Sequence, residues 1–199
     1  MALDKATLET SLSDTFSSME SDSDFASGIA SACKSYVEGG TITTIDGGTI
    51  SSGVFAGNGS GSASVSDSLM SAQINTAIAQ MKQVTSGGDN ILANGIFNGL
   101  KAMLAQAQVS INVKGNVTQG SSTSYMEGTA SGTGITCTDS GFVSSLLDCF
   151  DEMKDRTSGG DSYFASQLAD IINTYVSTGQ VVTEGQGTLA GSTGSGSIA

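Results

Sequence analysis

The segment SDFASGIASACKSYVEGGTIT (residues 23–43) recurs near the end of the chain as SYFASQLADIINTYVSTGQVVT (residues 162–183). The matching positions share one constant offset of 139 residues, and they are Phe25, Ala26, Ser27, Tyr36 and Val37. A more diverged middle copy shares the tetrapeptide SGGD, which stands at residues 86–89 and again at 158–161. Self-similarity at regular intervals is the signature of a repeated structural unit. We therefore predict three tandem repeats, over residues 1–65, 66–138 and 139–199, which can pack as one pseudo-threefold domain.

Apolar residues three or four positions apart predict two amphipathic helices in each repeat. The stripes of the first helices are Leu8, Leu12, Phe16 and Met19; Met70, Ile74, Ile78 and Met81; and Phe142, Leu146, Phe150 and Met153. Their predicted N-caps are Asp4, Asp67, and Asp139 or Ser140, and those of the second helices are Asp24, Asp89 and Asp161. The loops between the two helices are short, so each pair should form an antiparallel hairpin.

After each helical hairpin the apolar period changes to two, which predicts a short β-hairpin. The strand pairs are TITTI (41–45) with TISSGVF (49–55), VSINVKGNV (109–117) with TSYME (123–127), and QVVTE (180–184) with TLAG (188–191). The clearest turn signal is Asp46-Gly47-Gly48. Isolated hairpins are marginal in water, so these strands should pair across repeats, with another chain or onto a larger sheet. The predicted fold class is α+β.

Each repeat closes with a tail rich in Gly, Ser and Thr: AGNGSGSAS (56–64), EGTASGTGIT (127–136) and AGSTGSGSIA (190–199). Such a tail is either a flexible linker or an extended segment along a neighbour's sheet edge. Ile135 and Ile198 end two of the tails at comparable places, which favours docking by β-strand addition.

The 199-residue chain has 19 Asp and Glu against 7 Lys and Arg, for a net charge of −12. Only 38% of its residues are hydrophobic, which favours several small cores over one large core. Without a basic cluster, binding to nucleic acid lacks its main electrostatic contribution. No apolar run is long enough for a membrane span, and the N-terminus shows no secretory signal. We therefore expect no nucleic-acid or membrane partner, and synthesis in a cytoplasm.

The chain has no His, which removes the Ser-His-Asp and Cys-His mechanisms and histidine metal ligands. Neither a dinucleotide-binding fingerprint nor a phosphate-binding P-loop is present, and the acidic stretch at 21–24 lacks the spacing of a calcium loop. The three cysteines are widely spaced and form no C-x-x-C pair, so neither a disulfide framework nor a zinc site is predicted. They are Cys33, Cys137 and Cys149. Cys33 and Cys149 fit buried helix positions, and a reactive thiol is the alternative. We predict no catalytic, cofactor-binding or metal-binding residues.

Three features together, MALDKATLETSL, the helix ends YVEGGTIT and YVSTGQVV, and the closing Gly-Thr/Ser-Gly-Ser-Ile, resemble small structural proteins of tailed-bacteriophage virions. The resemblance covers nearly the whole chain, which departs from the pattern by its three units and its proline-free tails. It implies a non-enzymatic protein bound in many copies to other virion proteins on a symmetric scaffold, made in the host cytoplasm and located in the virion. Three units suit capsid decoration slightly better than the tail or baseplate.

A surface-binding module or adhesin is the alternative function, in which the Thr-rich β-arms contact a glycan or a host protein. Exposed aromatic side chains on those arms would favour it. Only Phe55 and Tyr125 lie in suitable positions. An enzyme is a third hypothesis.

Overall fold

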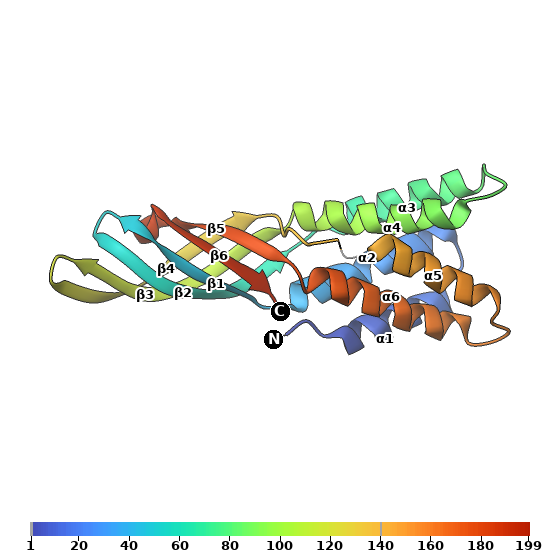
Figure 1. The fold of residues 1–199 in the computed structure, drawn as a ribbon, viewed down its shortest axis with the longest axis horizontal. Coiled ribbons are helices and arrows are strands. Elements are labelled where there is room, and N and C mark those ends of the chain that lie inside the picture. Colours follow the sequence, from blue (N-terminus) through green and yellow to red (C-terminus); the bar gives the residue numbers. More distant parts are fainter. Residues whose placement is uncertain (1, 140) are drawn as a thin grey trace.

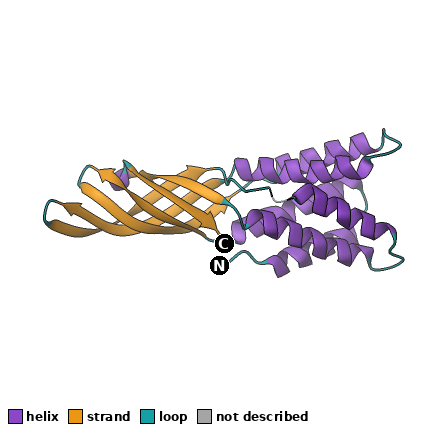
Figure 2. Cartoon of the chain, viewed as in Figure 1, coloured by secondary structure: helices purple, strands orange, loops and turns teal. Residues whose placement is uncertain are grey.

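The computed structural model describes residues 2–139 and 141–199 as an elongated molecule with helices at one end and strands at the other (Figures 1 and 2). Along these residues, two helices followed by two strands occur three times. The elements are α1 (Lys5–Ser18), α2 (Asp22–Gly39), β1 (Ile42–Ile50), β2 (Gly53–Ser64), α3 (Ser68–Met81), α4 (Gly88–Ala105), β3 (Gln108–Gln119), β4 (Ser122–Thr133), α5 (Phe142–Lys154), α6 (Gly160–Val176), β5 (Gln180–Gln186), a 3₁₀ turn (Gly187–Leu189) and β6 (Ser192–Ile198). The predicted α+β class is confirmed.

The helices form one bundle in which each packs against its neighbours along the chain, and α1 packs on α6 to complete the ring. Tyr36 of α2 and Asn173 of α6 link two of the hairpins, because the Tyr36 hydroxyl donates a hydrogen bond of 2.6 Å to the Asn173 amide oxygen. Stacked rings fill the joint between α1 and α6, where the centroids of Phe16 and Phe164 lie 4.9 Å apart. The bundle is therefore tied together by contacts between hairpins as well as within them.

The predicted N-caps are only partly right. Asp4 caps α1 by accepting hydrogen bonds from the Ala6 and Thr7 amides. The Asp67 side chain makes no capping hydrogen bond to α3. Asp139 accepts from the amides of residues 141 and 142 at the start of α5, and Ser140 lies outside the described residues.

The predicted caps of the second helices lie inside their first turns instead. Ser21 caps α2, while α4 and α6 begin after Gly87 and Gly159, whose positive φ angles of 78° and 68° turn the chain sharply into the helix. Asp24, Asp89 and Asp161 lie just beyond these caps, where a carboxylate still interacts favourably with the helix dipole.

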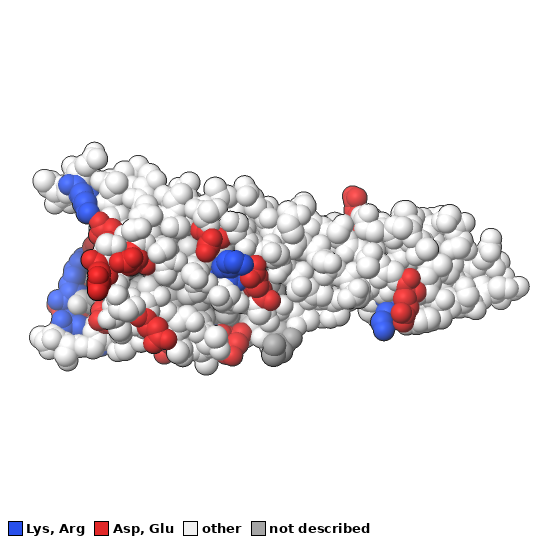
Figure 3. Space-filling model, turned by 180° about the vertical axis from the view of Figure 1, so that it is seen from behind, with Lys and Arg blue, Asp and Glu red and all other residues white. Residues whose placement is uncertain are grey.

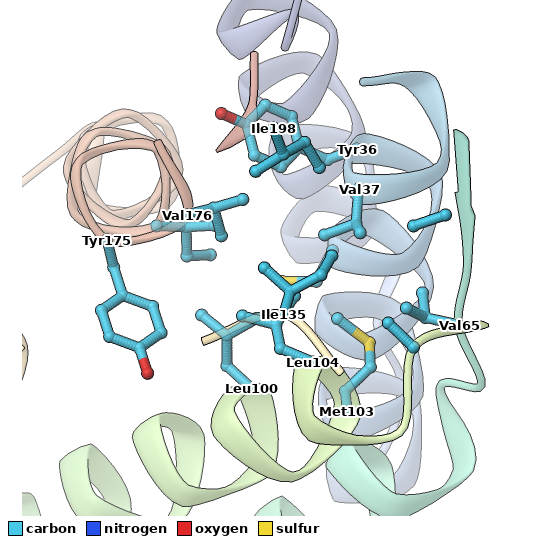
Figure 4. Packing of buried hydrophobic residues seen from close by; sticks show 14 of the residues in the cluster. Tyr36, Val37, Val65, Leu100, Met103, Leu104, Ile135, Tyr175, Val176 and Ile198 are labelled. Atoms are coloured by element: carbon cyan, nitrogen blue, oxygen red, sulfur yellow. The ribbon is translucent and has the colours of Figure 1, made fainter. Parts of the chain in front are cut away.

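One continuous hydrophobic core runs from the bundle into the barrel, so the prediction of several small cores was wrong. Figure 4 shows the joint, where Ile135 and Ile198 pack among side chains of α2, α4 and α6. Both isoleucines are at least 96% buried. They close the bundle against the base of the barrel, which leaves neither available to dock on a neighbouring chain.

The six strands of the described residues form a closed antiparallel barrel in the order β1-β2-β3-β4-β5-β6, with β6 paired to β1. The β-hairpins thus pair with one another within the chain, which was one of the three predicted alternatives. Most of each glycine-rich tail is strand, in β2, β4 and β6, so neither a flexible linker nor strand addition describes them.

Two of the predicted turns were misplaced, and the β3–β4 hairpin was predicted correctly. Strand β1 continues through Asp46-Gly47-Gly48, because these residues pair with β2 on one side and β6 on the other. The chain turns at residues 51–52 instead. The last hairpin turns at residues 187–191, so β6 lies mainly in the segment interpreted as a tail. Pairing on both sides of a strand outweighs a local turn preference.

Glycine lines the barrel because there is no room for a side chain at these positions. The inward positions of β2 and β6 include Gly57, Gly59, Gly61, Gly194 and Gly196. A β-carbon on Gly61 would lie 1.9 Å from the Ser110 carbonyl oxygen. One on Gly196 would lie 1.8 Å from the Thr43 carbonyl oxygen. The alternating glycines therefore permit the tight coiling of a narrow six-stranded barrel.

Candidate interaction surface

Charge is concentrated on the helical bundle and nearly missing from the barrel. Only three of the 19 acidic residues and one of the seven basic residues lie in the strands: Asp46, Glu127, Glu184 and Lys114. Asp46 points into the barrel and is buried. In Figure 3 the barrel surface is accordingly almost white, whereas red and blue side chains gather over the bundle. The barrel therefore presents a long outer face of hydroxyl, amide and apolar groups.

Four large apolar or aromatic side chains stand out on this outer face: Ile45, Val54, Tyr125 and Val182. Ile45 is 76% exposed and Val182 is 68% exposed. Both pair with Ser195 of β6, so they flank that serine on adjacent strands. Two strand spacings place them roughly 10 Å apart. We call Ile45, Val182 and Ser195 the barrel patch.

Sequence reasoning missed the barrel patch, although a signal was present. In TITTI, Ile42 and Ile45 are an odd number of residues apart, so one strand cannot bury both. The structure buries Ile42 with Thr44 and Asp46 and turns Ile45 outward. The adjacent Val181 and Val182 likewise lie on opposite faces of β5, so Val181 is buried and Val182 is exposed.

Tyr125 lies on the outer face in a small polar cluster. Its hydroxyl donates a hydrogen bond of 2.7 Å to Glu127 Oε1, and Lys114 Nζ lies 3.4 Å from the same oxygen. The hydrogen bond to Glu127 raises the pKa of the Tyr125 hydroxyl, and the same bond lowers the pKa of the Glu127 carboxyl, with Lys114 adding to that effect. Phe55, the second predicted exposed aromatic residue, is 1% exposed, because its phase on β2 points it inward.

Asp46 is the buried acidic group of the barrel. Its Oδ2 accepts a hydrogen bond of 2.5 Å from Thr44 Oγ1, and its Oδ1 accepts one of 3.5 Å from Thr183 Oγ1. A β-carbon on Gly194 would lie 2.0 Å from Oδ1. The carboxylate thus occupies space that glycine leaves open, and its hydroxyl partners offset part of the cost of burial. It links β1 to β5 across the barrel interior.

The carboxylates of the acidic stretch at 21–24 have separate partners and do not form a common site. Asp24 Oδ2 accepts hydrogen bonds from the Ser21 hydroxyl and the Glu20 amide, which is local capping of α2. Asp22 forms an ion pair with Lys82. Within residues 2–139 and 141–199, no group of three or more Cys, Asp or Glu side chains is placed to hold a metal ion.

The cysteines have the environments of buried apolar residues. Cys33 and Cys149 are buried, as predicted, and Cys137 is partly buried. Burial raises the pKa of the Cys33 thiol to about 12 and the pKa values of the Cys137 and Cys149 thiols to about 11. A thiol becomes a good nucleophile when its pKa is lowered. The three environments therefore act against reactivity.

No protein-family model, curated protein or solved structure matches the chain significantly. None of the helices in the described part of the chain combines the length and the apolar character needed to cross a membrane.

Proposed function

We propose that this chain is a non-enzymatic structural protein of a tailed-phage particle, made in the host cytoplasm and carried in the virion. In this proposal the outer face of the barrel contacts other virion proteins and the charged bundle points away from that contact. The observation that carries it is the separation of charge: the strands hold three acidic residues and the rest of the chain holds the others. A weakly charged face with exposed Ile45 and Val182 suits contact with protein, because interface centres are depleted of charge.

We further propose that the chain consists of three tandem repeats, over residues 1–65, 66–138 and 139–199. The threefold succession of two helices and two strands supports this organisation. Each unit contributes one helical hairpin to the bundle and one β-hairpin to the barrel. A pseudo-threefold molecule of this kind fits a local threefold position as a monomer, which favours capsid decoration over a place in the tail or baseplate.

In this proposal the strands contact other virion proteins in a different way from strand addition to an open sheet edge. Every strand already has two neighbours, so contacts use the side chains of the outer face. The β4–β5 seam has the shortest pairing, in which Thr129–Ser131 of β4 pair with Glu184–Gln186 of β5. An added strand from a neighbour would have to enter there.

Mass spectrometry of gradient-purified particles of the phage that encodes the chain tests the proposal. We expect the chain at a fixed copy number relative to the major structural proteins. Replacing Ile45 and Val182 together by Asp should reduce incorporation strongly, whereas the same change of charge at Thr10 and Thr76, which are exposed on α1 and α3, should not. Absence of the chain from intact particles would refute the proposal.

A surface-binding module is the second candidate, and the exposed ring of Tyr125 favours it. Tyr125 is 63% exposed on a face rich in hydroxyl and amide groups, a setting in which aromatic rings contact glycans or proteins. A glycan array probed with the purified chain and with Tyr125→Ala tests this function. Binding that the substitution abolishes would support the second candidate.

A further inference from the structure

A groove opens at the end of the bundle farthest from the barrel, between the α1–α2 connection and the end of α3. It has a volume of about 460 Å³. Five apolar side chains line it: Met19, Phe25, Ile78, Met81 and Leu92. Glu20, Ser21, Asp22 and Lys82 complete the lining. We call this site the end groove.

The end groove lies at the joint between α2 and α3, which among the described residues lacks the ring pairs found at the other two joints between hairpins. Stacked rings fill the joint between α1 and α6, and Phe97 packs on Phe142 between α4 and α5. None of the ring pairs in residues 2–139 and 141–199 joins α2 to α3. Methionine, isoleucine and leucine side chains line that joint together with the single ring of Phe25, and Met19 remains 42% exposed. The bundle therefore leaves apolar surface uncovered at this joint.

The charge around the groove indicates the chemistry of its occupant. Glu20 and Asp22 line it and Asp24 follows, against one cation, Lys82. Lys82 forms an ion pair with Asp22. Among the described residues Glu20 makes no ion pair, so its charge is available to an incoming cation. With −12 on the whole chain, a positively charged partner is also attracted over a distance.

We propose that the end groove binds a basic amphipathic helix of a partner protein. A large apolar side chain of that helix enters between Met19 and Met81, and an adjacent Lys or Arg pairs with Glu20. Flexible methionines suit this role, because they adapt to differently shaped apolar side chains. The inference goes beyond the proposed function and does not depend on it, because it concerns the opposite end of the molecule and any source of such a helix.

A fluorescence-anisotropy titration tests this site with a synthetic Leu/Lys peptide of about 18 residues, roughly five helical turns, patterned for one apolar face. A Leu/Glu peptide of the same pattern is the charge-reversed probe. We expect saturable binding of the Leu/Lys peptide, weaker at higher salt, and no binding of the Leu/Glu peptide. Binding of both peptides alike, or of neither, would overturn the proposal. Retention of the neutral dye Nile red in the groove without peptide binding would assign the site to small apolar molecules instead.

Met81→Lys and Thr76→Lys form a matched pair, because each adds one positive charge to α3 and Thr76 is exposed and lies outside the groove lining. Met81 is the last residue of α3, where a cation is favourable for the helix, so the variant should fold. We expect at least tenfold weaker peptide binding for Met81→Lys and less than a twofold change for Thr76→Lys. Equal weakening in both would show a general charge effect and refute the site.

Glu20→Gln provides a second, surface substitution that leaves the packing intact, and it should weaken binding and reduce its salt dependence. Methyl NMR of the unsubstituted chain gives an independent readout. The peptide should shift the methyl signals of Met19 and Met81 and leave that of Met126, on β4, in place. A shift confined to Met126 would contradict the proposal.

Discussion

Gly196→Ala should destabilise the protein far more than a single added methyl group ordinarily does. The new β-carbon would lie 1.8 Å from the Thr43 carbonyl oxygen and 2.7 Å from the Thr43 carbonyl carbon. Real β-carbons keep at least 3.0 Å from such atoms, so β6 and β1 must separate locally by more than 1 Å. A separation of that size stretches a hydrogen bond of about 2.9 Å beyond its useful range.

Two contributions determine how far Gly196→Ala lowers the free energy of unfolding. Overpacking a tight interior costs about 1–3 kcal/mol, and each lost ladder hydrogen bond costs about 1 kcal/mol. Gly196 pairs with Val181 of β5, and its neighbour Ser195 pairs with Ile45 of β1, so the strain acts on both neighbouring strands. We therefore expect the free energy of unfolding to fall by about 3–4 kcal/mol, a large part of the total of about 5–15 kcal/mol for a typical domain.

Urea unfolding followed by far-ultraviolet circular dichroism measures this effect, and the chain offers two matched controls. In Gly47→Ala, on the outer face of β1, the new β-carbon lies 3.4 Å from the Phe55 carbonyl oxygen, an ordinary contact. In Gly160→Ala, at the start of α6, it meets no atom within 4 Å. Both should change stability by no more than about 1 kcal/mol. If Gly196→Ala were as stable as Gly47→Ala, the explanation of the glycine-rich strands as barrel lining would be wrong.

Three further predictions concern the core. Burial raises the pKa of the Cys33 thiol from 9.0 to about 12, so the folded chain keeps a proton that the unfolded chain loses. The contribution of Cys33 to stability should therefore be constant below pH 9 and fall as pH rises from 9 to 12, by up to about 1.4 kcal/mol per pH unit. Cys33→Ala should flatten this dependence of unfolding free energy on pH in denaturant titrations. Identical pH curves for the variant and the unsubstituted chain would contradict the raised pKa of Cys33. Tyr36→Phe should lower the free energy of unfolding by about 1–2 kcal/mol, because it leaves the Asn173 amide oxygen without its donor. A double-mutant cycle with Asn173→Ala should give a coupling free energy above zero. Ile198→Ala, at the joint, should lower the free energy of unfolding by about 2–4 kcal/mol, whereas Ile45→Ala, on the outer face, should change it by no more than about 0.5 kcal/mol. Equal losses of stability in the two variants would refute the burial assigned to Ile198.

The helices could be predicted from the sequence because their information is local. Leu8, Leu12 and Phe16 are spaced for one face of a helix, and that face is buried. The positions of Asp24, Asp89 and Asp161 marked the starts of the second helices to within a turn, although the capping residues differ. Which hairpins contact one another was not readable, because pairs such as Tyr36 and Asn173 are 137 residues apart.

The candidate surface could be predicted only in part. Tyr125 was recognised as an aromatic residue on a β-arm, and it is exposed. Phe55 was assigned the same role and is buried, since its orientation depends on the phase of β2 within the barrel. The barrel patch and the end groove depend on which residues the closed barrel and the packed bundle leave uncovered. Such surfaces are properties of the assembled molecule.

By itself, the sequence determined the order of helices and strands and the acidic character of the chain, because composition and periodicity are local properties. Only the tertiary structure decided the role of the glycine-rich tails. A segment such as Gly194-Ser195-Gly196 has the composition of a flexible linker, and nothing local distinguishes it from one. It becomes a strand because β1 and β5 lie on either side of it and supply hydrogen bonds. At the inward positions Gly194 and Gly196 the surrounding atoms also come so close that no side chain larger than hydrogen fits.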